Sequence, residues 1–180
     1  MIETARLILS AWTEAERAPF VAMCADPEVM HDYPAPEDAV TASARFDRYA
    51  AALARDGFGK WALRRRDDGA FLGFCGVSPI WGTLLPAPGL EIGWRMVRAA
   101  WGRGYATEAA RASLADIFAR TDADEVISFT LPTNTRSLAV MARLGLTRDA
   151  SRDFVYETGL PAVVFVASRI RYAVRTEGTT

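Results

Sequence analysis

The 180-residue chain contains few of the side chains that most often bind metals or form disulfides. It has one histidine, His31, and two cysteines, Cys24 and Cys75, which do not have the spacing of metal ligands. Two cysteines are too few for a disulfide framework, so we expect a reduced, cytoplasmic protein without a metal. No apolar run approaches the ~20 residues that span a bilayer, and the N-terminus lacks a signal-peptide pattern. We therefore expect no membrane insertion and no secretion.

The chain also has no large excess of charge of either sign. It carries 21 lysines and arginines against 22 aspartates and glutamates, a formal net charge of −1. That balance gives no electrostatic reason to expect direct binding of nucleic acid or of an anionic membrane. There is no internal repeat, low-complexity tract or linker, and the length suits one domain. We expect a single domain over residues 1–180, with a polar tail at about 175–180.

What the chain does have is a strand–glycine–helix pattern between residues 91 and 110. Gly102 and Gly104 follow a strand-like stretch and precede a segment with apolar residues at helical spacing. Such a turn presents free backbone N–H groups at a helix N-terminus, where a phosphate binds well. The two glycines let the backbone approach a ligand closely, Arg103 adds positive charge, and Thr107 or a neighbour can cap the helix. An ordinary turn between a strand and a helix is the alternative explanation.

A Gly-x-Gly turn can also begin a dinucleotide-binding fingerprint. Here Thr107 occupies the position of the third glycine. The acidic residues Asp122, Asp124 and Glu125 precede the next expected strand instead of ending it, where a ribose would be bound. The phosphate-binding pattern Gly-x-x-x-x-Gly-Lys-Ser/Thr is absent as well. The sequence therefore disfavours a dinucleotide or nucleotide triphosphate as the ligand.

The segment Trp-Gly-Arg-Gly-Tyr-Ala-Thr-Glu-Ala at 101–109 resembles the acetyl-CoA pyrophosphate loop of the GNAT N-acetyltransferases. It is most similar to the RimJ/RimL-like branch, which acetylates the N-termini of ribosomal proteins. Gly104 and Ala106 match the last two fixed positions of the loop, whereas Trp101 replaces the usual Gln or Arg. Segments 4–9 and 26–30 resemble the same branch, and segment 134–146 resembles the second GNAT signature. The resemblance implies that acetyl-CoA is bound by Met96, Val97, Arg98, Trp101, Gly102, Arg103, Gly104, Tyr105, Ala106, Thr107 and Asn134.

The rest of the chain predicts the order of secondary structure elements. Strands are expected at 4–9, 61–66, 71–77, from 91, at 125–131, 154–157 and 163–171. Helices are expected from the Thr13–Glu16 capping box to Asp26, over 39–55, after the glycine turn, and from Asn134 to Gly145. The resemblance implies an α+β fold: a mixed, mostly antiparallel seven-stranded sheet, splayed between its fourth and fifth strands, with helices on both faces. The apolar segment 78–90 is interpreted as a substrate-side lid or as the contact of a homodimer.

The chemistry of amide formation from a thioester requires a neutral amine and a polarised carbonyl. Backbone N–H groups near Met96 and Val97 can polarise the carbonyl, as in an oxyanion hole. An α-amine has a pKa near ~7.7–8.0, so about a tenth is neutral at pH 7, whereas a lysine near ~10.4 needs a committed base. Glu91 is our candidate base or water-holder, although a charge at a strand end explains it equally. His31 lacks a partner in sequence, and Glu108 is explained by the helix dipole alone.

The departing thiolate also needs a proton or a hydrogen bond. In many GNAT enzymes a tyrosine seven residues after the signature asparagine supplies it, and here that position is Met141, which cannot donate. In the RimJ/RimL-like branch a serine three residues after the asparagine is the proposed substitute, and Ser137 occupies that position. Ser137 is also an ordinary residue for the first turn of a helix. Asn134 can cap that helix and hold the pantetheine arm at once.

Together these patterns predict an acetyl-CoA-dependent N-acetyltransferase that acts by direct attack of a primary amine on the thioester. The expected acceptor is the α-amine of a protein or peptide N-terminus. A small amine, such as an amino acid, a polyamine or an antibiotic, is the alternative acceptor. The loss of the tyrosine at Met141 also leaves open a non-catalytic module that binds acyl-CoA.

Overall fold

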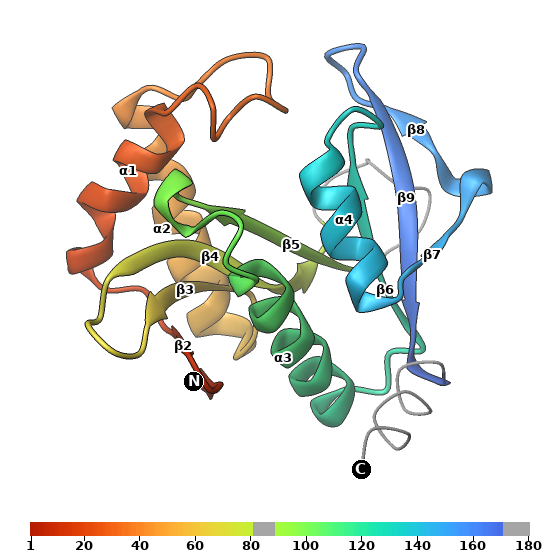
Figure 1. The fold of residues 1–180 in the computed structure, drawn as a ribbon, viewed down its shortest axis with the longest axis horizontal. Helices are drawn as coiled ribbons and strands as arrows, with labels where there is room; N and C mark the ends of the chain where they lie inside the picture. Colours follow the sequence, from red (N-terminus) through yellow and green to blue (C-terminus); the bar gives the residue numbers. More distant parts are fainter. Residues whose placement is uncertain (81–88, 171–180) are drawn as a thin grey trace.

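The computed structural model describes residues 1–80 and 89–170, whose arrangement is shown in Figure 1. Its centre is an open sheet with the strand order β1-β2-β3-β4-β5-β6-β9-β7, and β8 pairs with β9. β5 and β6 run parallel, and the other neighbouring strands run antiparallel. The described strands are β1 (Ile2–Glu3), β2 (Leu7–Ser10), β3 (Lys60–Arg65), β4 (Phe71–Pro79), β5 (Leu90–Met96), β6 (Glu125–Thr130), β7 (Thr147–Arg148), β8 (Phe154–Val155) and β9 (Pro161–Ser168).

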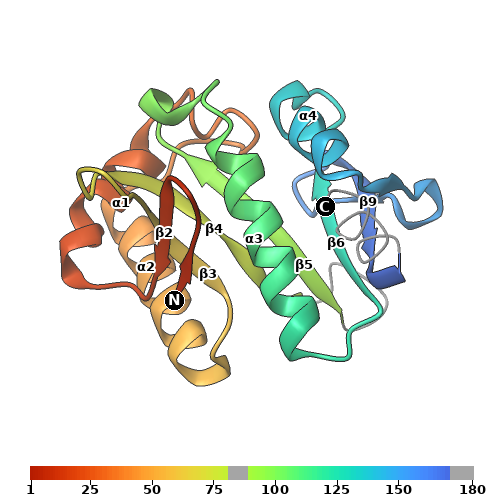
Figure 2. The ribbon, with the colours of Figure 1, turned by 60° about the horizontal axis from the view of Figure 1, so that its bottom comes forward.

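Helices cover both faces of the sheet. Successive residues of β4 point to opposite faces: Phe74 packs on Tyr49 with ring centroids 5.2 Å apart, whereas Cys75 Sγ lies 3.9 Å from Ser113 Oγ. The helices that carry Tyr49 and Ser113 therefore lie on opposite sides, as Figure 2 shows. The helical segments are η1 (Glu14–Glu16), α1 (Arg17–Ala25), α2 (Ala39–Asp56), η2 (Arg98–Ala100), α3 (Tyr105–Arg120), α4 (Thr135–Leu144) and η3 (Ala150–Arg152).

The helix boundaries follow from their caps. The amide N of Thr13 donates to Glu16 Oε2 at 2.8 Å, which forms the expected capping box ahead of α1. α4 is capped at its N-terminus by Asn134, whose Oδ1 accepts from the Ser137 amide at 3.1 Å. It ends at Gly145 with φ 76°, after which the Leu146 amide donates to the Met141 carbonyl. The sequence patterns therefore located these helices correctly.

The splay of the sheet lies between β5 and β6. These strands are paired at one register position, Glu91 with Ile127, whereas β4 and β5 are paired at seven. Beyond Glu91 the two strands diverge and leave an opening toward the carboxyl end of β5. This is the expected splay between the fourth and fifth strands, since β1 adds one strand ahead of it.

The sheet has nine described strands instead of the expected seven. The two additional strands, β1 and β7, are two residues long each, too short to show an alternation of apolar and polar side chains. β9 begins at Pro161, two residues before its expected start, because a proline is tolerated as the first residue of a strand. The interpretations of the 78–90 loop and of the 175–180 tail lie largely outside the described residues.

Buried apolar side chains from both faces form the core. Ala110, Leu114 and Ile117 of α3 are at most 1% exposed, in agreement with the stripe expected from their spacing. Within residues 1–80 and 89–170, none of the helices has the length and apolarity that crossing a membrane requires. The same residues contain no cluster of three or more histidine, cysteine or acidic side chains suited to a metal ion.

Candidate active site

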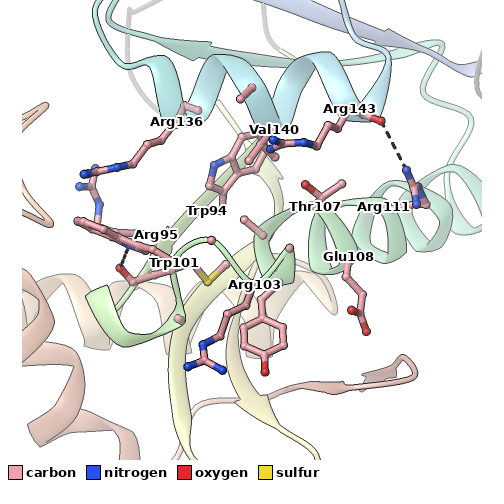
Figure 3. Close-up of a pocket in the computed structure, with 18 of the residues that line it drawn as sticks. Trp94, Arg95, Trp101, Arg103, Thr107, Glu108, Arg111, Arg136, Val140 and Arg143 are labelled. Carbon is pink, nitrogen blue, oxygen red and sulfur yellow. Dashed lines mark hydrogen bonds between the residues drawn. The ribbon is translucent and has the colours of Figure 1, made fainter.

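A cleft of about 1330 Å³ occupies the opening between β5 and β6. The end of β5, the glycine loop and α3 form one side, and α4 forms the other (Figure 3). Ten of the residues chosen from the sequence line it: Met96, Trp101, Gly102, Arg103, Gly104, Tyr105, Ala106, Thr107, Asn134 and Ser137. Val97, Arg98 and Glu91 do not line it, although they lie on or directly after β5.

The glycine loop leaves backbone donors at the N-terminus of α3 without a side-chain cap. Gly104 is the N-cap residue with φ 79°, and it has no side chain to accept from the first turn. The first bond of the helix runs from the Glu108 amide to the Gly104 carbonyl, so the preceding amides have no partner within the helix. A Cβ added at Gly102 would meet no atom within 4 Å. Thr107 lies in the first turn and does not cap. The loop thus has the open space and the donors that a pyrophosphate requires.

The N-terminal residues hold this loop in place. Arg6 Nη1 donates to the Arg103 carbonyl at 3.0 Å, and Arg6 Nε donates to Glu108 Oε2 at 2.7 Å. Thr4 Oγ1 also donates to Glu108, at 2.6 Å. Partial burial alone would raise the pKa of Glu108, but the hydrogen bonds from Thr4 and Arg6 outweigh it and lower that pKa. Glu108 is therefore a structural carboxylate, and the role of Arg6 could not be found from sequence spacing.

Six arginines and two carboxylates line the cleft. Each of the two carboxylates, Asp32 and Glu108, is paired with an arginine. The surplus of guanidinium groups matches the charge of a phosphate-bearing ligand. Trp101 donates its indole N–H to the Met96 carbonyl at 2.9 Å, and the Arg136 guanidinium stacks over its ring at 3.9 Å (Figure 3). Arg136 thereby brings a positive charge from α4 to the position where the resemblance expects Gln or Arg.

At the end of β5, the backbone N–H groups of Met96 and Val97 point in opposite directions. The Val97 amide donates to the Leu72 carbonyl at 3.0 Å, so it faces β4. Because successive N–H groups of a strand point to opposite edges, the Met96 N–H points toward the opening. Arg98 does not line the cleft, and its guanidinium pairs with Asp26 at 2.9 Å and with Glu28 at 2.5 Å. Met96 therefore has the geometry of an oxyanion donor, and Val97 does not.

The two candidate catalytic side chains lie in different settings. Ser137 lies in the first turn of α4 and lines the cleft. Met141, one turn further, is 1% exposed and packs in the core. Glu91 lies at the first pairing of β5 and β6, roughly 17 Å along the strand from Met96. Its Oε1 is 2.9 Å from Nζ of Lys60, a lysine that is 4% exposed.

His31 lies at the mouth of the cleft. It is exposed, its Nδ1 is 3.0 Å from the Glu28 carbonyl, and it lines both the main cleft and a smaller adjoining pocket of about 350 Å³. The structure therefore places His31 at the edge of the cleft, with a backbone carbonyl and not a carboxylate beside its Nδ1.

Fold and cleft together define an enzyme class that binds a phosphate-bearing cosubstrate between two diverging strands, with its phosphates at a helix N-terminus. The model of the acetyltransferase (GNAT) domain family matches residues 6–147. The chain therefore belongs to the GNAT acetyltransferases.

Individual relatives agree with this assignment. The chain is 33% identical over 125 residues to the FsC-acetyl coenzyme A-N(2)-transacetylase of Aspergillus fumigatus, a match over 67% of this chain and 52% of the relative. It is also 33% identical over 90 residues to the uncharacterized protein YkkB of Bacillus subtilis, covering 50% of this chain and 51% of that protein. The chain thus matches about half the length of these curated relatives.

Solved structures show the same fold. An acetyltransferase from Agrobacterium tumefaciens superposes with a TM-score of 0.78 at 26% identity, covering 92% of both chains. The aminoglycoside acetyltransferase AAC(6')-Ib, solved with coenzyme A, gives a TM-score of 0.73 at 18% identity and covers 95% of this chain and 99% of its own. A putative ribosomal-protein-serine acetyltransferase from Vibrio cholerae gives 0.73 at 19% identity, with 93% and 96% covered. At such identities the last two show the fold alone.

Proposed function

We propose that the protein is a RimJ/RimL-like enzyme that acetylates the α-amine of a protein or peptide N-terminus. The observation that carries the proposal is the state of Glu91, the candidate base, and of Glu108. Glu91 is paired with the buried Lys60 and does not line the cleft, and Glu108 is paired with Arg6. Neither is an unpaired carboxylate in the cleft, which a strongly basic amine would need as its base. An α-amine, with a pKa near ~7.7–8.0, is already partly neutral at pH 7 and needs the least assistance.

In this proposal the amine nitrogen attacks the thioester carbonyl, the C–N bond forms and the C–S bond breaks. The Met96 N–H, which faces the opening, stabilises the charge that develops on the carbonyl oxygen. Ser137 donates a hydrogen bond to the departing sulfur, which leaves as a thiolate and takes a proton to become the free thiol. The proton that the amine nitrogen loses passes to water, because Glu91 lies about 17 Å along β5 from Met96 and is paired with Lys60. Asn134 and the 101–107 loop bind the cosubstrate.

Two further features support the proposal. Segments 4–9 and 26–30 follow the RimJ/RimL-like pattern, and Ser137 stands three residues after Asn134 as in that branch. Arg6, Asn134 and Ser137 all lie along the cleft. The free and buried thiols of Cys24 and Cys75 suit a reducing compartment, so we place the enzyme in the cytoplasm.

A small amine is the second candidate acceptor, because an aminoglycoside acetyltransferase has the same fold and covers 95% of this chain. The two candidate acceptors differ in the charge that the site would have to bind. A polyamine or aminoglycoside carries several positive charges, whereas an N-terminal peptide carries one reacting amine and a chain of amide groups.

The test is a matched set of acceptors with acetyl-CoA. A lysine-free peptide with a free N-terminus is compared with the same peptide blocked at its N-terminus and carrying one lysine, and with spermidine and an aminoglycoside. Release of the CoA thiol and the mass of the product are measured. We expect acetylation of the free N-terminus, with a rate that rises with pH and levels off above about pH 8. Acetylation of the lysine peptide or of the small amines alone would overturn the proposal.

A further inference from the structure

One carboxylate in the loop between α1 and α2, that of Asp32, contacts residues on both sides of the splay in the sheet. Asp32, whose side chain is 17% exposed, lies in this loop and lines the cleft. Its Oδ1 accepts from Arg95 Nη1 at 2.8 Å, and its Oδ2 accepts from Arg95 Nη2 at 3.1 Å. The same Oδ2 accepts from Asn134 Nδ2 at 3.2 Å. Arg95 belongs to β5 and Asn134 caps α4, so Asp32 joins the two sides of the opening.

Arg95 fixes the carboxylate on the β5 side. Its side chain is 11% exposed, and its guanidinium binds Asp32 through two nitrogens. Arg95 Nη1 also donates to the Val29 carbonyl at 2.5 Å, and the guanidinium lies 4.7 Å from the centre of the Tyr33 ring. A bidentate pair with these additional contacts has little freedom to rotate. The position of the Asp32 carboxylate is therefore set by β5.

Asn134 links the Asp32 carboxylate to the first turn of α4. It is 5% exposed, and its amide is engaged at both ends: Nδ2 donates to Asp32, and Oδ1 accepts from the Ser137 amide at 3.1 Å. The Asn134 carbonyl accepts from the Leu138 amide at 3.1 Å, the first bond of the helix. A rotation of the Asn134 amide would break both side-chain bonds. The first turn of α4, which carries Ser137, is thus held relative to β5 through the chain Arg95–Asp32–Asn134.

We propose that Asp32 is a positioning residue for acetyl transfer, because it fixes the Asn134 amide and with it the distance of Ser137 from the carboxyl end of β5. Asp32 does not act on the reacting atoms itself. A displacement of about 1 Å in a catalytic group can cost about a hundredfold in rate, so this link matters for turnover even if the fold survives without it.

The same loop provides a matched control. Asp26 also anchors this segment, through Arg98 at 2.9 Å, and neither residue lines the cleft. Asp26→Asn therefore loosens the loop without touching Asn134. If Asp32 only anchored the loop, the Asp26 and Asp32 variants would behave alike.

The first measurement needs no acceptor. Hydrogen exchange is followed in the first turn of α4 for the wild type, Asp32→Ala, Asp32→Asn and Asp26→Asn. Asp32→Ala removes every acceptor of the bridge, whereas Asp32→Asn keeps one oxygen that can still turn toward Asn134 Nδ2. We expect exchange of the Ser137 amide to rise about tenfold or more in Asp32→Ala, to rise less in Asp32→Asn and to stay unchanged in Asp26→Asn. Unchanged exchange in a folded Asp32→Ala protein would overturn the proposal.

The second measurement separates the bridge from the helix cap. Asn134→Ser keeps an N-cap acceptor for α4 but removes the donor to Asp32. On the acceptor found in the screen, we expect Asp32→Ala and Asn134→Ser each to lower kcat about tenfold or more. The double variant should lose no more than either single variant, and KM for acetyl-CoA should change less than kcat. Independent losses that multiply in the double variant would overturn the proposal, whichever amine proves to be the acceptor.

Discussion

Gly104 combines two requirements, a left-handed backbone and a side-chain-free approach to the phosphates. We expect Gly104→Asp to weaken CoA binding by far more than tenfold, because a carboxylate would then lie where the pyrophosphate is bound. Gly57 is a matched control, since it caps the end of α2 with φ 73° and an added Cβ meets nothing within 4 Å. Gly57→Asp should cost about 1 kcal/mol of stability and leave CoA affinity intact. Calorimetric titration of CoA into both variants tests this, and equal affinities would mean that the loop is only a turn.

Ser137 can act as a hydrogen-bond donor or merely as a residue of the first turn. If its hydroxyl assists departure of the sulfur, Ser137→Ala should lower turnover by up to about a hundredfold, since serine is a weak acid. CoA affinity should stay nearly unchanged, because the Ser137 amide, and not its hydroxyl, binds Asn134. Steady-state kinetics and thermal unfolding of the variant are the measurements. Full turnover in Ser137→Ala would show that the hydroxyl has no catalytic role.

The two cysteines give a prediction about pH. Burial raises the pKa of the Cys75 thiol from 9.0 to about 12 and that of Cys24 to about 11. Both thiols are therefore still protonated in the folded protein at a pH where the unfolded chain has lost those protons. Their contribution to stability is present below about pH 9 and is lost as the pH rises toward 11 to 12. In urea unfolding at pH 8, 9 and 10, the free energy of unfolding should decline as the pH rises. A free energy of unfolding that does not change over this range would contradict the raised pKa values of the two thiols.

At the scale of the elements, the pair of Lys60 on β3 and Glu91 on β5 marks the point where the sheet begins to splay. Lys60 is almost fully buried, so Glu91→Gln would leave an ammonium group without its counter-charge. We expect this change to cost about 3 kcal/mol or more. Lys60→Met should cost less, because Glu91 is 24% exposed and water can hydrate it.

Chemical unfolding of Glu91→Gln, of Lys60→Met and of the double variant tests whether the first change costs more stability than the second. The double variant should be more stable than the sum of the single losses predicts. Asp116→Asn is the surface control, because Asp116 pairs with Arg120 on α3 and should contribute about 0.5 kcal/mol or less. Equal losses for Glu91→Gln and Asp116→Asn would mean that the buried pair contributes little.

Local sequence patterns predicted the helices and strands but not the contacts between residues far apart in the chain. The spacing of Phe46, Tyr49 and Leu53 predicted α2, and all three are buried. The contacts of Lys60, Arg6 and Asp32 join residues 31 to 102 positions apart, and they depend on strand register and loop path, which no local pattern specifies. For the same reason, the burial of Met141 could not be predicted. Its sequence position is that of the proton donor in many GNAT enzymes, but in α4 its side chain packs into the core.

At the scale of the whole molecule, the cleft separates two parts of the sheet that the cosubstrate would bridge. We expect acetyl-CoA or CoA at about a hundred times its dissociation constant to stabilise the fold by about 2.7 kcal/mol. For a chain of this length that corresponds to a rise in Tm of about 5–10 °C. NAD and ATP at the same concentration should give no rise. Differential scanning calorimetry is the measurement, and a shift with NAD but none with CoA would contradict the cofactor assignment.

The single pairing of Glu91 with Ile127 has a consequence for how the sheet is exposed. An ordinary open sheet has two edges where main-chain donors and acceptors lack a neighbouring strand, and this sheet has two more in its middle. Edges of this kind invite pairing with foreign strands, and proteins protect them with charge or with covering elements. Here α3 and α4 flank the opening, and six arginines line it. The inner edges thus meet helices and positive charge instead of a neighbouring strand, and the sheet keeps unpaired main-chain donors and acceptors beside the glycine loop.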